Sequence, residues 1–268
     1  GTALPAAQTA FIRFVYGSVF LSPALLAAFR TGIPKAVLPL IGLRGAFHTL
    51  AVIFWFYAMA RIPIADVTAI GYLSPIVVTA GAALLLGEPL ALRRMIAIGV
   101  ALVGAMVVLR PGLRELQPGH MAQVGAAISF GLSYIVAKRL ASVLPAGALV
   151  ALLSLTVTVG LAPLALWAWI TPTAGQLALL AVVALFATAG HYFMARAFAA
   201  APAGLTQPVV FLQLIWATLL GWFAFGERVD PYVVLGGAII IGAISYMSWR
   251  EAQISRAGTT PPPDLEKS

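Results

Sequence analysis

The sequence predicts an all-α integral membrane protein made of two inverted-topology helical repeats. Of its 268 residues, 62% are hydrophobic and only 9% are charged, whereas a water-soluble domain carries roughly a quarter charged residues. The apolar runs lack the residue-by-residue alternation of a membrane β-barrel, so helices are favoured. One apolar unit also occurs twice along the chain, and duplicated units are typical of transporters that bind their cargo between two halves.

A helix that crosses a bilayer needs about 20 mostly apolar residues. Nine runs approach or exceed this length, and most junctions between them contain Pro or Gly in turn-forming combinations. The predicted spans are residues 6–28, 36–59, 64–86, 91–109, 120–141, 146–170, 175–199, 204–225 and 231–249.

The duplicated unit comprises residues 60–109 and 199–247. Aligning Gly87 with Gly226 also superposes Pro63 on Pro202. We therefore predict a first repeat of four spans at residues 1–113 and a second repeat of five spans at residues 114–250. Residues 251–268 are polar and Pro-rich and are expected to form a disordered cytoplasmic tail.

The first predicted repeat has four spans and the second has five, which suggests that the first repeat lacks one helix. The span near residues 119–139 has no counterpart in front of Gly1, so we expect a ten-helix arrangement whose first helix is missing from this chain. A genuine nine-helix protein is the alternative. With an odd number of helices in each complete unit, the two repeats would have opposite orientations in the bilayer.

The basic residues indicate orientation rather than a nucleic-acid partner. The net charge is +8, but the basic residues stand singly or in pairs between apolar runs. The face richer in Lys and Arg is expected to be cytoplasmic. This predicts a multi-pass protein of the bacterial cytoplasmic (inner) membrane with its C-terminus inside. The residues assigned to that face are Arg30, Lys35, Arg93, Arg94, Lys138, Arg139, Arg196, Arg250, Arg256 and Lys267.

Several catalytic classes find no support in the sequence. Cys is absent, and the three His residues are too far apart in sequence for a metal-ligand motif. No Walker-type phosphate loop, HxxxH, GxSxG or acidic pair occurs. We therefore expect a non-enzymatic protein with no metal and no cofactor.

Motifs in both repeats resemble those of the drug/metabolite transporter superfamily, specifically its EamA-type members. The resemblance rests on Gly87-Glu88 and Gly226-Glu227, each after an apolar run and before a Gly-rich helix, and on Arg13-Phe14 and residues 127–139. It implies ten helices in two inverted five-helix halves. The chain is also similar to bacterial amino-acid exporters of the YddG type, which implies small-molecule export.

The candidate site centres on charged and polar residues inside the predicted spans, where such groups usually face a cavity or a partner. Arg44 and His48 are four residues apart and share one helical face. The repeat aligns Val52 of that face with His191. These three side chains could recognise a carboxylate or polarise an amide. Alternatively, Arg44 pairs with a carbonyl or snorkels, and each His satisfies a helix contact.

Further pocket candidates come from neighbouring spans. Tyr72 and Gln207 lie on stripes that the repeat relates. Ser133 lies on the span 120–141, and Trp216 lies on the other side of the span that carries Gln207. Arg13, by contrast, is expected to snorkel to the membrane surface. The substrate-binding prediction therefore comprises Arg44, His48, Tyr72, Ser133, His191, Gln207 and Trp216.

The functional prediction is a secondary transporter that works by alternating access. Its partners would be the lipid bilayer and a small-molecule substrate, most readily an amino acid, carried by efflux or exchange. Another metabolite or drug class, or a non-saturable channel, is the alternative. Glycines on the last helix of each repeat permit either packing within the chain or a homodimer.

Overall fold

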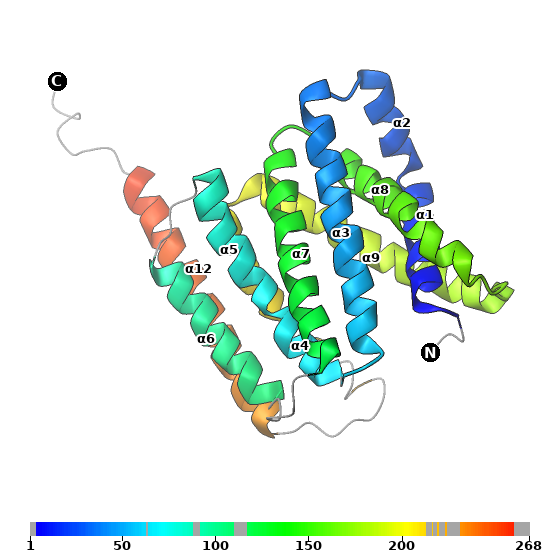
Figure 1. The fold of residues 1–268 in the computed structure, drawn as a ribbon. Coiled ribbons are helices and arrows are strands. Elements are labelled where there is room, and N and C mark those ends of the chain that lie inside the picture. The colour runs from blue at the N-terminus through cyan, green and yellow to red at the C-terminus, as the bar shows by residue number, and fades with distance from the viewer. Residues whose placement is uncertain are drawn as a thin grey trace, which may run out of the picture. The chain divides into compact units, whose positions relative to one another are not determined.

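The computed structural model describes residues 4–62, 64–87, 92–109, 117–212 and 231–259, together with Trp216, Leu219 and Phe223 (Figure 1). In this part of the chain all regular elements are helices, as the sequence predicts. They are α1 (Ala6–Phe20), α2 (Ser22–Thr31), the 3₁₀ helix η1 (Lys35–Val37), α3 (Leu38–Met59), α4 (Ile64–Gly71), α5 (Leu73–Leu86), α6 (Leu92–Leu109), α7 (Pro118–Leu140), α8 (Ala146–Trp167), α9 (Ala174–Ala200), α10 (Ala203–Thr206), the 3₁₀ helix η2 (Gln207–Phe211) and α12 (Pro231–Thr259).

The chain forms two compact units. Unit 1 combines Gly1–Glu88 with Leu113–Ala203, and unit 2 combines Pro89–Gly112 with Gly204–Ser268. Each unit therefore takes segments from both predicted repeats. The repeat boundary near residue 113 remains a prediction from the sequence.

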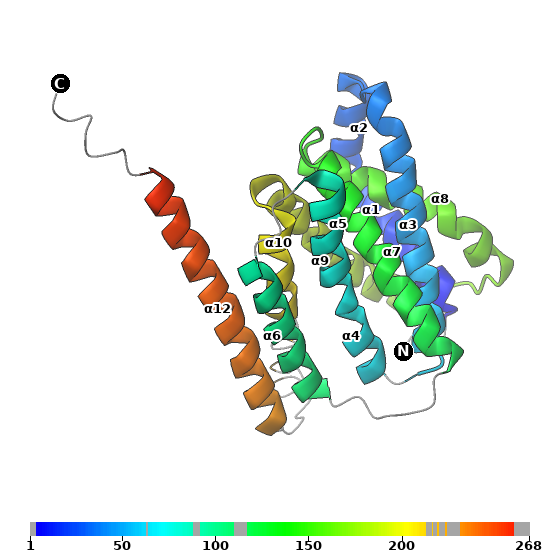
Figure 2. The ribbon, with the colours of Figure 1, turned by 60° about the vertical axis from the view of Figure 1, so that its left-hand side comes forward.

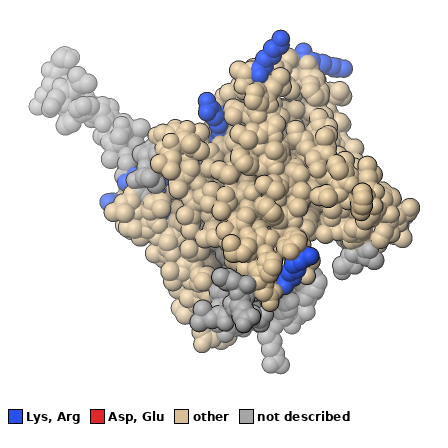
Figure 3. Space-filling model, viewed as in Figure 1, with Lys and Arg blue, Asp and Glu red and all other residues tan. Residues whose placement is uncertain are grey.

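Four helical segments of the described chain are long and apolar enough to cross a membrane: 35–59, α7, α8 and α9. Figure 3 shows few described Lys and Arg side chains on this face, and most of the described surface there is uncharged. Large apolar side chains such as Trp167 and Phe186 are 92% and 73% exposed. Such exposure is typical of side chains that face lipid.

Two of the predicted spans are interrupted rather than straight. The predicted span 6–28 is split into α1 and α2, which are bent by 62° to one another, and Pro23 lies in the first turn of α2. The predicted span 64–86 divides at Tyr72, just before Pro75. Proline lacks the N–H that would bond the preceding turn, so it favours a break at these points.

The C-terminal helix is longer than the sequence suggests. α12 continues to Thr259, whereas a disordered tail is expected from residue 251. The added segment begins Glu251-Ala252-Gln253, which are good helix formers, and Gly258 and Pro261 come only later. Residues 260–268 lie outside the described part.

In unit 1, α7 lies between α3 and α5, as Figures 1 and 2 show. Small residues bring α5 and α7 together: a Cβ on Gly131 would lie 2.5 Å from Val77 Cγ1, and one on Gly81 would lie 2.1 Å from Ile135 Cδ1. α8 packs against both α1 and α3. This arrangement places the middle parts of α1, α3 and α7 around a common interior.

The amide of Gln8 fixes the start of α1. Its Nε2 donates to the carbonyl of Ile170 at 2.6 Å, and its Oε1 accepts from the Ile170 N–H at 3.0 Å. Gln8 is fully buried. The side chain therefore substitutes for a backbone partner and ties α1 to the connection between α8 and α9.

In unit 2, α6 packs along α12. A Cβ on Gly104 would meet the Gly236 carbonyl oxygen and Ile240 Cγ1, both at 2.9 Å. These glycines therefore serve close packing within the chain, one of the two roles expected for them.

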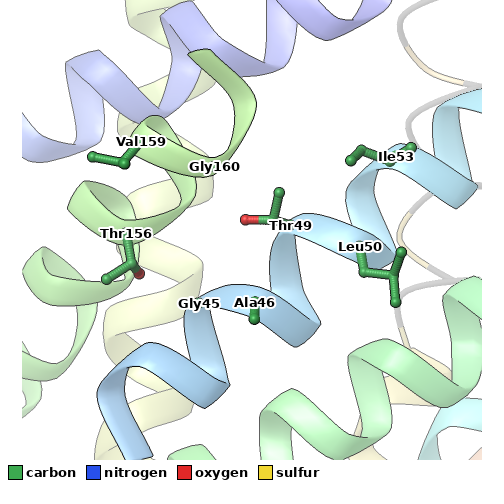
Figure 4. A pocket seen from close by; sticks show the side chains of 8 residues that line it. All are labelled: Gly45, Ala46, Thr49, Leu50, Ile53, Thr156, Val159 and Gly160. Carbon is green, nitrogen blue, oxygen red and sulfur yellow. The ribbon is translucent and has the colours of Figure 1, made fainter. Parts of the chain in front are cut away.

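Glycine also sets the approach of α3 to α8. A Cβ on Gly45 would lie 2.5 Å from Thr156 Cβ, and one on Gly160 would lie 2.6 Å from Thr49 Oγ1. These four residues line a groove of about 390 Å³ between the two helices, together with Ala46, Leu50, Ile53 and Val159 (Figure 4). Each glycine thus gives space to a threonine of the other helix.

Gly45→Ala should destabilise unit 1, because its Cβ would overlap Thr156 and force α3 away from α8. We expect a loss of about 1–3 kcal/mol in unfolding free energy, typical of overpacking, measured as a lower Tm in detergent. Gly42→Ala is the matched control, since a Cβ there meets nothing within 4 Å. An unchanged Tm for Gly45→Ala would contradict the close contact.

Candidate functional site

His48 on α3 is the centre of a buried cluster in unit 1. It is 2% exposed, and aromatic rings from three other helices meet its imidazole edge to face. The centroid distances are 5.8 Å to Phe14, 5.1 Å to Phe130, 6.4 Å to Tyr134 and 5.4 Å to His191. The structure therefore brings α1, α3, α7 and α9 together around one imidazole.

Ser133 links His48 to the backbone of α3. Its hydroxyl donates to the carbonyl of Arg44 at 3.3 Å and also lies 3.3 Å from His48 Nδ1. Because the hydroxyl has one hydrogen, Ser133 Oγ accepts from His48 Nδ1 while it donates to Arg44. This assigns the proton of His48 to Nδ1 and fixes its ring between α3 and α7.

Arg44 ties α3 to α8. Its Nη1 donates to the carbonyl of Leu149 at 2.7 Å, and the side chain is 3% exposed. Its Nε is buried without a hydrogen-bond partner in the described structure. Arg44 Nη1 thus pairs with a carbonyl, which is one of the two alternatives that the sequence left open for this residue. Arg44 Nε is left without a partner in the described structure.

Arg13 faces inward instead of snorkelling. Its Nη2 lies 3.4 Å from His191 Nε2, and its guanidinium carbon lies 4.2 Å above the Phe14 ring. A guanidinium can only donate, so His191 Nε2 accepts and its proton resides on Nδ1. His191 Nδ1 is buried with no hydrogen-bond partner among the described residues.

The helices that form this cluster carry basic side chains and no acidic ones. Residues 1–65 and 116–226 contain no Asp or Glu, and these segments include α1, α3, α7, α8 and α9. Two guanidinium groups and two imidazoles therefore share a bundle whose own helices supply no carboxylate. Charged groups placed this way in membrane proteins usually serve a ligand or an ion pathway.

Lys138 connects the same region to the end of α9. Its Nζ donates to the carbonyls of Phe198, at 2.6 Å, and of Ala201. The rings of Tyr134 and Phe198 contact one another nearby, with centroids 6.3 Å apart. A cation at a helix C-terminus satisfies carbonyls that lack a partner, so Lys138 holds α7 to α9.

The structure gathers four of the seven predicted site residues: Arg44, His48, Ser133 and His191. Tyr72 is buried at the break between α4 and α5. Gln207 begins η2, but its side chain lies outside the described residues, and Trp216 is 64% exposed.

Sequence reasoning missed Arg13, Phe14 and Phe130 as members of the cluster. The position of Arg13, seven residues inside an apolar helix, was the only signal in the sequence. Its partner His191 is 178 residues away, so their contact could not be predicted from spacing.

Comparison with known proteins gives the family. The sequence profile described as "EamA-like transporter family" matches residues 2–110 and 117–249. The chain belongs to the EamA-like transporter family. The interval between the two matched stretches coincides with the predicted boundary of the repeats. This EamA-like transporter is accordingly a multi-pass membrane protein that carries small molecules.

Curated relatives of this EamA-like transporter are named for different cargoes. A riboflavin transporter of Rhizobium johnstonii is 32% identical over 95% of this chain and 84% of its own length. An S-adenosylmethionine uptake transporter of Rickettsia prowazekii is 28% identical over 94% and 85%. A pseudopaline exporter of Pseudomonas aeruginosa is 25% identical over 91% and 87%. Both uptake and export therefore occur among proteins similar to this chain.

A solved crystal structure supports the fold. Its chain superposes on this EamA-like transporter with a TM-score of 0.79, covering 92% of this chain and 90% of the other at 20% sequence identity. At that identity the likeness concerns the fold alone.

Ser133→Ala should destabilise unit 1, because it removes the acceptor of His48 Nδ1 in a fully buried position. A buried donor without a partner costs about 1–3 kcal/mol, which thermal unfolding in detergent would register as a lower Tm. Ser142→Ala serves as the control, since its hydroxyl makes only an exposed local bond to Arg139. Equal Tm values for the two variants would contradict a stabilising role for the buried hydrogen bonds of Ser133.

Proposed function

We propose that this EamA-like transporter moves small amphipathic metabolites, with amino acids as the leading class, across the bacterial cytoplasmic membrane by alternating access. Transport would be efflux or exchange, and the C-terminus would lie in the cytoplasm. The observation that carries the proposal is the cluster of Arg13, His48, Ser133 and His191 within a bundle of membrane-spanning helices, where Arg44 ties α3 to α8.

The chemistry of the cluster suits an amino-acid-like cargo. Guanidinium and imidazole N–H groups bind carboxylates by charge-assisted hydrogen bonds. The rings of Phe14, Phe130 and Tyr134 offer apolar surface beside them. Ligand sites commonly combine a mostly apolar lining with a few placed polar groups. S-adenosylmethionine, the named cargo of one relative, is itself an amino-acid derivative.

A second candidate cargo class is an uncharged heteroaromatic metabolite. The relative named for riboflavin favours it, and the aromatic shell around His48 would stack on a planar ring. The two classes differ in whether the cargo needs an acidic group, so one transport panel can separate them.

The breaks in the helices supply places where motion can occur. The 62° bend between α1 and α2, beside Pro23, and the break at Tyr72 between α4 and α5, just before Pro75, leave backbone groups outside a continuous hydrogen-bond ladder. Segments on either side of such breaks can rotate with little loss of hydrogen bonding. Alternating access needs this kind of movement around a site near the middle of the bilayer.

Counterflow in liposomes tests the proposal. Vesicles containing the purified protein would be loaded with an unlabelled metabolite, and uptake of the labelled compound would be followed for amino acids, S-adenosylmethionine and riboflavin. We expect saturable, exchange-stimulated uptake of at least one amino acid. Flux that rises linearly with concentration would indicate a channel instead, and absence of flux for every class would refute the proposed cargo.

Replacing His48 or His191 by Gln should reduce amino-acid counterflow about tenfold, because each change removes an imidazole from the cluster while preserving polarity. One good hydrogen bond to a charged group is worth about this factor. His120→Gln is the control, since His120 accepts a bond from Gln117 N–H at the start of α7, away from the cluster. Normal counterflow in both test variants, at normal expression, would rule out the site.

A further inference from the structure

We propose that Arg13 and His191 form the recognition pair for an anionic group, a carboxylate, on the transported molecule, and that Arg44 is a structural tether. This inference rests on the proposed function, because it assigns roles within the same cluster. It differs from the sequence-based interpretation, which assigns the recognition role to Arg44 and expects the Arg13 side chain to snorkel to the membrane surface.

The contacts of Arg44 keep it in a structural role. Its Nη1 is bonded to the α8 carbonyl of Leu149 at 2.7 Å, and its own carbonyl accepts from Ser133 of α7 at 3.3 Å. The side chain is 3% exposed. Turning Arg44 toward a cargo would therefore break the link between α3 and α8.

Arg13 has N–H groups that are available to bind a ligand. Its polar contact in the described structure is with a single lone pair, His191 Nε2, at the long distance of 3.4 Å. A guanidinium carries five N–H groups in a planar fork that matches the two oxygens of a carboxylate. Arg13 is also only half-buried, so it has access that Arg44 lacks.

His191 completes the pair. Since Nε2 accepts from Arg13, the proton is on Nδ1, and that buried N–H has no partner among the described residues. Its ring also faces His48, with centroids 5.4 Å apart. A carboxylate that takes the Arg13 donors would gain a second donor from His191 and would place its carbon skeleton beside Phe14 and His48.

The counter-charge must come from outside these helices. Residues 1–65 and 116–226 contain no acidic residue, so α1 and α9 carry the pair without a carboxylate of their own. A guanidinium inside an apolar bundle is stabilised by a paired anion. An anionic cargo would provide that partner during transport.

Thermal unfolding of the purified protein in detergent tests the inference without requiring transport. The probes are N-acetyl-L-phenylalanine, which is anionic, and N-acetyl-L-phenylalaninamide, which is neutral and otherwise matched. We expect the acid to raise the Tm at concentrations at least tenfold lower than the amide does. Arg13→Gln and His191→Gln should abolish this preference, and Arg13→Lys should retain part of it.

Two controls separate recognition from folding. Arg30→Gln removes an exposed cation at the end of α2 and should leave the preference unchanged. Arg44→Gln should lower the Tm without ligand but keep the preference in the protein that remains folded. If Arg44→Gln abolishes the preference while Arg13→Gln retains it, the two roles are reversed and the inference is wrong.

The thermal-unfolding test and the transport assay can fail independently of one another. Equal stabilisation by acid and amide, or none by the acid, in the unaltered protein would overturn the recognition pair even if counterflow were observed. Preferential stabilisation by the acid with no flux of the tested metabolites would support the pair and refute the proposed cargo.

Discussion

The placement of basic and polar side chains inside an apolar helical bundle is the constraint on which the rest of the structure depends. Such groups are costly in a membrane unless most of their donors find acceptors in the protein or on a ligand. Here carbonyl oxygens, one hydroxyl and aromatic rings serve as partners. Arg44 takes a carbonyl of α8, Ser133 connects His48 to α3, and Lys138 caps α9. These bonds cross between helices, so meeting the constraint also fixes how the helices pack.

Close helix packing makes those bonds reachable. Hydrophobic burial cannot hold two helices together in lipid as it does in water, because lipid tails are as apolar as the side chains. Glycine at the crossing points compensates by letting backbones approach. Gly45 and Gly160 each give space to a threonine across the α3–α8 contact, and Gly131 gives space to Val77. The carbonyl of Leu149 then lies within reach of Arg44.

The two arginines of the cluster illustrate how a shared environment yields different roles. Arg44 is bound to neighbouring helices and stabilises the bundle, whereas Arg13 contacts a neutral imidazole and an aromatic ring. The relatives of this transporter carry chemically dissimilar cargoes in both directions. A common helical frame with locally varied polar groups would account for such diversity, because cargo selection then depends on few side chains.

Composition and periodicity alone determined that the chain is helical and membrane-spanning, because solvent preference is a property of each segment. The sequence also indicated Arg44, His48, Ser133 and His191, since polar residues stand out within apolar runs. It could not decide which of these meet, because the contacts join residues 85 to 178 positions apart. Arg13 shows this most clearly: a long basic side chain seven residues inside an apolar helix is compatible with lipid headgroups or with the interior. α1 packs against α9, and this packing brings His191 Nε2 within 3.4 Å of Arg13 Nη2. Only this tertiary contact decided that the guanidinium points inward.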